Sequence, residues 1–319
     1  MDPAWRTATG SALVWIGDAE ETLRRLPDAS VRACVTSPPY FQLRDYGVER
    51  QIGLEPSIDE YIGRLVAVFR EVHRVLRDDG TLWVVIADTY GRGRRVLSAG
   101  DRERWAHGQS AWANAAPQGT AVLPDKQLLG VPWRLAFALQ ADGWILRSDI
   151  IWAKPAPLPE SVRDRPTRSH EHVFLLAKSP NYYYDLEAAT EPARTDPQRQ
   201  RRDRSGESWN LGGPYKPHTG FKNEGSGRRH LRDVWVLHAR GAGGSHYATF
   251  PLALAERVIL IASQPGDVVL DPFAGSGTTL VAAQRNGRTG WGIELNPAYL
   301  PIIQRRCAQQ ALPWWSEGP

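Results

Sequence analysis

The sequence predicts an α/β fold in which helices cover both faces of a mostly parallel sheet. Three observations support this fold class. Short apolar runs typical of buried strands alternate with segments of helical periodicity along the 319 residues. Several of these runs end abruptly on an acidic or polar residue. A content of 42% apolar and 23% charged residues is typical of a chain that forms a core.

The N-terminal third alternates strands and helices. Apolar residues recur at helical spacing between Ile62 and Leu76, which predicts a long helix. Ser57 or Asp59 is expected to cap its first turn, and Gly80 is expected to end it. In chain order, the predicted elements are a strand at 12–18, a helix at 19–28, a strand at 31–36, the helix at 57–80 and a strand at 81–88.

The alternation continues around two aperiodic stretches, 91–126 and 186–235, which are rich in Gly and Arg. Such long loops inside a domain are usually functional or disordered. The other predicted elements are helices at 132–143, 250–262, 277–287 and 297–310, and strands at 144–154, 170–178, 267–271 and 289–295.

Basic charge is concentrated in the second aperiodic stretch. The whole chain carries a net charge of +4, yet residues 194–232 hold ten Lys/Arg against four Asp/Glu, so this segment carries +6 and the remainder −2. Such a segment is typical of a surface that meets phosphates, and equally of a solvated insert.

Other classes of protein find no support in the sequence. The two cysteines, Cys34 and Cys307, are too few for a disulfide framework or a four-cysteine zinc site. Residues 169–174, SHEHVF, do not form an H-E-x-x-H zinc motif because position 174 is Phe. The sequence shows no membrane span and no signal-peptide core, so we expect a cytoplasmic protein.

Residues 268–283, VVLDPFAGSGTTLVAA, predict a strand, a tight turn and a helix. Gly275 and Gly277 remove side chains from the turn, so a ligand can lie against the backbone at the helix N-terminus. Glu294, which ends the next strand, can accept both hydroxyls of a ribose. Thr278 and Leu280 depart from the P-loop and the G-x-G-x-x-G fingerprint, which favours an adenosine ligand without a phosphate chain.

The predicted strand 31–36 ends on a stiff corner, SPPY at 37–40. Proline cannot extend a paired strand because it lacks a backbone N–H and its φ is fixed at about −65°. Taken alone, this corner is a rigid turn with a packed tyrosine. Its meaning depends on the glycine turn more than two hundred residues further on.

Together, TSPPY at 36–40 and DPFAGSGTT at 271–279 resemble the DNA amino-methyltransferases that use S-adenosylmethionine. Ser37 before the prolines is similar to the N4-cytosine group, whereas adenine enzymes usually carry aspartate there. The order of the two motifs resembles the β class. The resemblance implies a class I methyltransferase (Rossmann-like) sheet of seven strands, mixed but mostly parallel, circularly permuted to begin at its third strand, with an irregular target-recognition insert.

The resemblance also implies a division of the chain into three parts. Residues 1–185 would form the catalytic half, 186–235 the target-recognition insert and 236–319 the cofactor-binding half. The strands that end at Thr36 and Asp271 would then be neighbours, and ligands of open α/β sheets bind at such a switch point.

Residue roles follow from the same resemblance. Asp18 is expected to contact the cofactor's adenine and Glu294 its ribose, with S-adenosylhomocysteine as the product and no metal. The remaining cofactor candidates are Thr36, Asp271, Phe273, Gly275, Gly277, Thr278, Asn296, His246, Phe250 and Pro251.

The proline corner is implied to be catalytic. N4 of cytosine is a poor nucleophile because its lone pair is delocalised into the ring. Ser37 Oγ and the Pro38 carbonyl would accept its two hydrogens and stabilise the developing positive charge, with Pro38 and Pro39 fixing their directions. Tyr40 would stack on the target base after the base is flipped out of the duplex.

Double-stranded DNA is the expected partner, with Arg201, Arg202, Arg228 and Arg229 as candidate contacts. The resemblance is also compatible with a homodimer and with a cognate restriction endonuclease. Three alternatives stay open: N6-adenine methylation by the same fold, a non-catalytic DNA-binding module, and a substrate other than nucleic acid. Methylation at carbon 5 is disfavoured because it needs a Cys nucleophile, and Cys34 and Cys307 lie within predicted elements.

Overall fold

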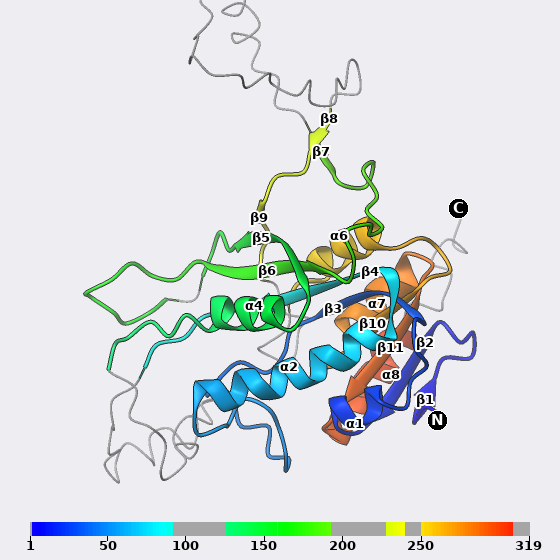
Figure 1. The fold of residues 1–319 in the computed structure, drawn as a ribbon, viewed down its shortest axis with the longest axis horizontal. Helices are drawn as coiled ribbons and strands as arrows, with labels where there is room; N and C mark the ends of the chain where they lie inside the picture. Colours follow the sequence, from blue (N-terminus) through cyan, green and yellow to red (C-terminus); the bar gives the residue numbers. More distant parts are fainter. Residues whose placement is uncertain (1, 92–124, 158, 193–227, 240–249, 309–319) are drawn as a thin grey trace, which may run out of the picture.

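The computed structural model describes residues 2–91, 125–157, 159–192, 228–239 and 250–308, which build a sheet between two layers of helices (Figure 1). The strand order is β1-β2-β11-β10-β3-β4-β6-β5-β9. These strands are β1 (Trp5–Arg6), β2 (Ala12–Ile16), β3 (Val31–Thr36), β4 (Leu76–Ile86), β5 (Ile145–Ala153), β6 (His170–Ala177), β9 (Val234–Val236), β10 (Val268–Asp271) and β11 (Thr289–Glu294).

The predicted mixed, mostly parallel sheet is confirmed. Strands β2, β11, β10, β3 and β4 pair in parallel, whereas β6 is antiparallel to both β4 and β5. The seven predicted strands form the centre of the sheet, and β1 and β9 extend it at the two edges. The first of the seven predicted strands, β2, lies three positions away from β3 because β11 and β10 are inserted between them, as expected for the permuted order.

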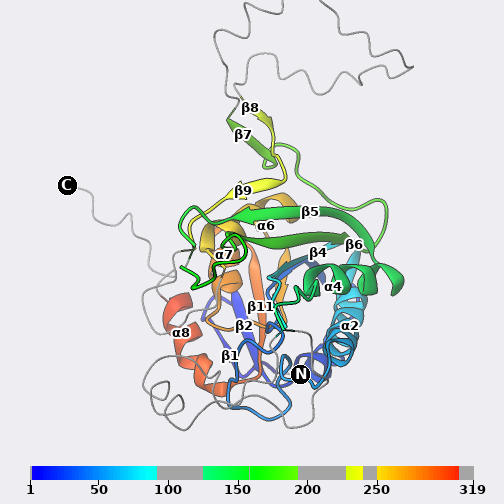
Figure 2. The same ribbon diagram turned by 90° about the vertical axis from the view of Figure 1, so that its left-hand side faces the viewer.

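Helices cover the sheet in two layers (Figure 2). Helices α1, α2 and α4 pack on one face, and α6, α7 and α8 pack on the other. Their bounds are α1 (Ala19–Leu23), α2 (Ile58–Val75), α4 (Val131–Ala141), α6 (Leu252–Ala262), α7 (Thr278–Arg285) and α8 (Leu300–Ala308), with a 3₁₀ turn, η2 (Pro297–Tyr299), before α8.

The long helix begins as predicted but ends earlier. Ser57 caps α2 by accepting a hydrogen bond from the Glu60 amide at 3.2 Å. The prediction that Gly80 ends the helix is wrong, because Leu76 already has extended backbone and begins β4. A Cβ at Gly80 would lie 2.9 Å from the Arg32 carbonyl oxygen, so this glycine permits the close approach of β4 to β3.

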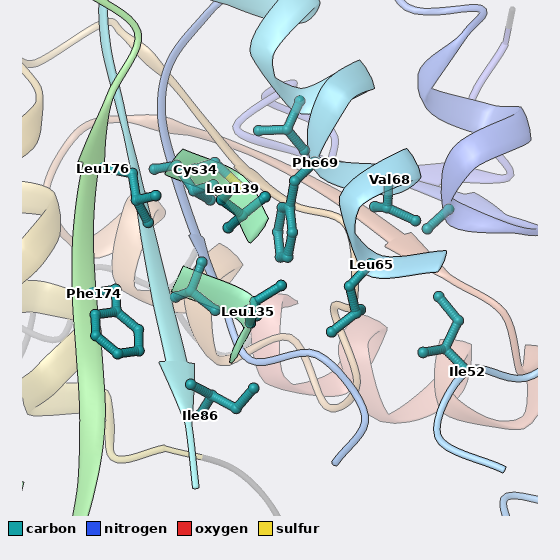
Figure 3. Close-up of a cluster of buried hydrophobic side chains, with 14 of the residues drawn as sticks. Cys34, Ile52, Leu65, Val68, Phe69, Ile86, Leu135, Leu139, Phe174 and Leu176 are labelled. Atoms are coloured by element: carbon teal, nitrogen blue, oxygen red, sulfur yellow. The ribbon is translucent and has the colours of Figure 1, made fainter. Parts of the chain in front are cut away.

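The core beneath the carboxyl ends of the strands is apolar and continuous with the loops above it (Figure 3). Side chains of α2 and α4, such as Leu65, Phe69 and Leu135, pack on Cys34 and Ile86 of the sheet (Figure 3). The fully buried Phe69 also places its ring 6.5 Å from that of Phe273, edge to face. This contact fixes the loop that follows β10.

The predicted insert 186–235 contains more regular structure than expected. Strands β7 (Thr190–Pro192) and β8 (Arg228–His230) pair antiparallel and stand away from the main sheet (Figure 1). Strand β9, at the predicted end of the insert, instead pairs in parallel with β5. None of the described helices is both long enough and apolar enough to cross a membrane.

Candidate active site at the carboxyl ends of the central strands

A cavity of about 860 Å³, its open mouth included, lies beyond the carboxyl ends of β2, β3, β10 and β11. The described residues that line it are Gly17, Asp18, Ala19, Ser37, Pro39, Arg44, Tyr46, Val48, Arg50, Gln51, Ile52, Pro272, Phe273, Gly275, Ser276, Glu294, Leu295, Asn296 and Tyr299. The proline corner and the glycine turn therefore face the same space.

Asp271 joins the two motifs from below the cavity. Its carboxylate accepts hydrogen bonds from Thr36 Oγ1 at 2.6 Å and from Thr279 Oγ1 at 2.7 Å. The Phe273 amide donates a third at 3.1 Å. Asp271 is only 2% exposed, and burial raises its pKa to about 6. Thr36 and Asp271, predicted to touch the cofactor, thus support the loops that line the cavity.

The glycine turn has the backbone that its sequence requires. Gly275 has φ of +51° and Gly277 has φ of +80°, a region that side chains disfavour. Gly275 lines the cavity, whereas Gly277 begins α7 and lies under Ile303, whose Cγ2 is 3.1 Å from the place of a Cβ. Thr278 is buried beside it and accepts a hydrogen bond from Arg306 at 3.2 Å.

Glu294 presents a carboxylate to the cavity. Its Oε2 accepts a hydrogen bond from the Gly275 amide at 2.8 Å, and its Oε1 accepts one from the Asn296 amide at 2.8 Å. Each oxygen keeps a second lone pair for a ligand hydroxyl. Burial raises the pKa of Glu294 to about 7, against the lowering effect of these two amides.

Asp18 also lines the cavity, after β2, the strand that pairs with β11. It caps α1 by accepting a hydrogen bond from the Glu21 amide through Oδ1 at 3.1 Å. The cap uses only Oδ1 of Asp18, whose side chain also lines the cavity. A carboxylate in this position can accept a hydrogen bond from an amino group of a ligand.

The proline corner is held by contacts with α2 and with the loop before it. Tyr61 Oη donates a hydrogen bond of 2.8 Å to the Pro39 carbonyl. Gly53, with φ of +107°, approaches Tyr40 so closely that a Cβ would lie 3.0 Å from its carbonyl oxygen. Ser37 and Pro39 line the cavity, Pro38 is buried, and Tyr40 is half-buried against the core.

One wall of the cavity was missed by sequence reasoning. Residues 44–52 and Tyr299 supply aromatic, aliphatic and arginine side chains to it. The buried Gln51 fixes this segment, because it accepts from the Tyr46 amide at 2.7 Å and donates to the Arg44 carbonyl at 3.0 Å. The segment has no helical or strand periodicity, so no signal in the sequence marks it as part of a site.

The remaining candidates lie elsewhere in the structure. Phe250 is buried in the core between the sheet and α6, and Pro251 precedes that helix. Arg228 and Arg229 lie on β8, on the projecting hairpin (Figure 1). Predicted contacts His246, Arg201 and Arg202 lie outside the described residues.

The cavity offers no cysteine nucleophile. Cys34 and Cys307 are both fully buried, in β3 and α8, and neither belongs to the lining. Burial raises the pKa of Cys307 to about 11 and that of Cys34 well above its usual value. Within the described residues no group of His, Cys, Asp and Glu could hold a metal ion.

These features suit a nucleoside-containing ligand. Glu294 and Asp18 offer acceptors for hydroxyl and amino groups, and the side chains of Ile52, Phe273 and Tyr299 offer an apolar lining for a base. The glycine turn at the start of α7 allows close backbone approach. Ser37, which follows β3 on the other side of β10 from β11, adds a hydroxyl to the same lining.

Comparison with known proteins places most of the chain in one family. A family model described as DNA methylase, covering N6 and N4 methyltransferases, matches residues 31–305. The type II methyltransferase M.Cfr9I of Citrobacter freundii is 48% identical over 295 residues, which are 92% of this chain and 87% of that protein.

Solved structures show the same architecture. TTHA0409 of Thermus thermophilus, solved with S-adenosylmethionine, is 26% identical, with a TM-score of 0.58 over 94% of this chain and 95% of its own. The PvuII DNA methyltransferase, described as cytosine-N4-specific, aligns with a TM-score of 0.63 over 96% of this chain and 88% of its own, and at 19% identity it shows the fold alone. The predicted permuted class I methyltransferase fold is confirmed, and the chain belongs to the DNA methylase family of N6 and N4 amino-methyltransferases.

Proposed function

We propose that the chain transfers the methyl group of S-adenosylmethionine to N4 of a cytosine flipped out of a specific duplex DNA sequence. The observation that carries this proposal is the shared cavity, which Ser37 lines together with Gly275 and Glu294. The 26% identical TTHA0409 binds S-adenosylmethionine on the same fold. Relatives such as M.Cfr9I are type II methyltransferases, which supports DNA as the substrate.

The residues of the cavity fit this cofactor, which supplies an electrophilic methyl group on a sulfonium. Glu294 would accept the ribose hydroxyls, and Asp18 would accept the adenine amino group. Asn296 orients Glu294 through its amide, and Phe273 and Gly275 line the passage towards Ser37. Thr36, Asp271, Gly277 and Thr278 act from beneath by holding these loops.

The target amine would meet the proline corner. Ser37 Oγ and the Pro38 carbonyl would accept its two hydrogens, which favours a pyramidal nitrogen and stabilises the charge that develops on it. Because the corner is fixed by Tyr61 and Gly53, these acceptors need little reorganisation during the reaction. Tyr40 would stack on the flipped base, and methyl transfer would be a direct in-line displacement that depends on positioning.

DNA would lie over the mouth of the cavity and reach the β7–β8 hairpin. Arg229 and Arg232 both donate to the Glu191 carboxylate, at 2.9 and 2.6 Å. Because two arginines share one carboxylate, this group of side chains beside the hairpin keeps a net positive charge. Arg228 is exposed beside them and donates to Thr190 Oγ1 at 2.6 Å. Such arginines would meet phosphates, with Arg201 and Arg202 of the same segment. The proposal also divides the chain into a catalytic half at 1–185 and a cofactor-binding half at 236–319, which flank the target-recognition insert. It further includes a homodimer and a cognate restriction endonuclease, both in a prokaryotic cytoplasm.

The adenine alternative rests on the same cavity and differs only in the target base. Ser37 in place of the usual aspartate favours cytosine. Tritium transfer from labelled cofactor to DNA, followed by nucleoside analysis, tests the choice. We expect the label on N4-methylcytosine. Label on N6-methyladenine would overturn the cytosine assignment, and no label on any DNA would favour a non-catalytic DNA-binding module.

A further inference from the structure

A row of hydrogen bonds runs from the proline corner to an ion pair between two other strands. Ser37 Oγ donates to Tyr40 Oη at 3.3 Å, and Tyr40 Oη donates to Glu171 Oε2 at 2.5 Å. The other oxygen of Glu171 accepts a hydrogen bond from Lys154 Nζ. Glu171 lies near the start of β6 and Lys154 directly follows β5, so the row links the corner to the antiparallel part of the sheet.

The ion pair is largely removed from solvent and fixed in place. The Glu171 side chain is 12% exposed and that of Lys154 is 21% exposed. Glu171 is opposite Trp152 in the β5–β6 ladder, and Lys154 Nζ lies 4.6 Å from the centre of the Trp152 ring. The Lys154 amide also donates to the Ser169 carbonyl at 2.7 Å. Because desolvation offsets the attraction in such a pair, stability alone is a weak reason for its presence.

The row has a direction that Glu171 sets. An ionised carboxylate only accepts hydrogen bonds, so Tyr40 must donate its proton to Glu171. The Tyr40 oxygen then accepts the Ser37 proton, which leaves the lone pairs of Ser37 Oγ for another donor. Burial, followed by the charge of Glu171, raises the pKa of Tyr40 well above its usual value, so the phenol stays protonated and the direction is kept.

We propose that Glu171, held by Lys154, is a positioning residue that makes Ser37 an acceptor for the target amine and fixes the Tyr40 ring. This inference rests on the proposed function. Glu171 touches neither cofactor nor base in it and acts only through the Tyr40 hydroxyl. An acceptor is what an amine nucleophile requires, because its N–H groups must be met by lone pairs.

A double-mutant cycle tests this role. Glu171→Gln and Tyr40→Phe are each expected to lower kcat about tenfold, while the KM for DNA and the Kd for S-adenosylmethionine change less than about twofold. In the Tyr40→Phe background, Glu171→Gln should change kcat by less than about twofold, since its route to Ser37 is already cut. Glu71→Gln, which breaks the Glu71–Arg74 pair on α2, is the matched control and should leave kcat unchanged.

Each outcome decides the proposal. The proposal would be overturned if the kcat of the double variant fell by the product of the two single effects. A weakened affinity of Glu171→Gln for S-adenosylmethionine would also overturn it. If Glu171→Gln loses its cooperative thermal transition, Lys154→Gln takes its place in the cycle, and misfolding of both variants would show that the pair is only structural. Wild-type methyl transfer is measured first: its failure refutes the proposed function, whereas an active wild type with an additive cycle refutes only this inference.

Discussion

Thr36 and Asp271 form a buried hydrogen bond of 2.6 Å across 235 residues of sequence. The bond joins the last residues of two neighbouring parallel strands, β3 and β10. The proline corner starts one residue after Thr36, and the glycine turn follows Asp271. The two halves of the proposed active site are therefore aligned by a contact that neither substrate nor cofactor makes.

Thr36→Val should destabilise the protein without changing the shape of the site. Valine fills the same volume but leaves an oxygen of Asp271 without this donor, which costs about 1–3 kcal/mol for a buried group. Thr36 is fully buried, whereas Thr9 is exposed, so Thr9→Val is the control and should cost less than about 0.5 kcal/mol. Urea unfolding measures both. Equal stabilities of the two variants would contradict the stabilising role assigned to the Thr36–Asp271 hydrogen bond.

Gly277→Ala should be more harmful than the same change at another left-handed glycine. Gly277 has φ of +80°, and Ile303 Cγ2 lies 3.1 Å from the place of a Cβ. Gly10 has φ of +70° with no atom within 4 Å of that place, so Gly10→Ala isolates the backbone strain, about 1 kcal/mol. We expect Gly277→Ala to cost about 1–3 kcal/mol more, as measured by thermal unfolding. Similar losses of stability in both variants would show that Ile303 on α8 moves aside without strain.

The sequence was informative where a motif is local and less so where the site is assembled from distant segments. The strand–turn–helix around Gly275 and the acid at Glu294 could be predicted because hydrophobic runs and glycines act within a few residues. The neighbourhood of Thr36 and Asp271 needed the family resemblance, because strand order is not written in periodicity.

Three features could not be predicted for physical reasons. Residues 44–52 lack periodicity, and their role comes from side-chain hydrogen bonds such as those of Gln51. Glu171 meets Tyr40 only because the sheet brings together residues 131 positions apart. The end of α2 was misplaced because Gly80 resembles a helix stop, whereas its lack of a Cβ serves strand pairing.

Cofactor affinity should fall in mild acid because of Glu294. Its pKa is about 7 in the ligand-free protein, raised by burial, and ribose hydroxyls donate to the ionised carboxylate. Protonation below that pH removes acceptor capacity, so the ligand binds the fraction that is ionised. We expect S-adenosylmethionine to bind about tenfold more weakly at pH 6 than at pH 8 in calorimetric titrations.

Glu294→Gln is the control for this pH dependence. The amide keeps one acceptor oxygen and cannot ionise, so its affinity should be weaker at pH 8 and nearly constant down to pH 6. Asp271, with a pKa of about 6, titrates at lower pH than Glu294 and is present in both proteins. Its effect on affinity therefore cancels when the two proteins are compared. A wild-type affinity that stays flat between pH 6 and 8 would remove Glu294 from the ribose site.

Ser37→Ala should separate catalysis from cofactor binding. The hydroxyl lines the cavity beside Pro39, so its loss should lower kcat about 10²-fold by removing an acceptor for the amine. The Kd for S-adenosylmethionine should stay within about twofold, because Glu294 and Asp18 are untouched.

Tyr40→Ala should instead raise the KM for DNA, since the target base loses its stacking partner. Single-turnover transfer and calorimetry measure these quantities, and a Ser37→Ala variant that loses cofactor affinity would show that the proline corner belongs to the cofactor site.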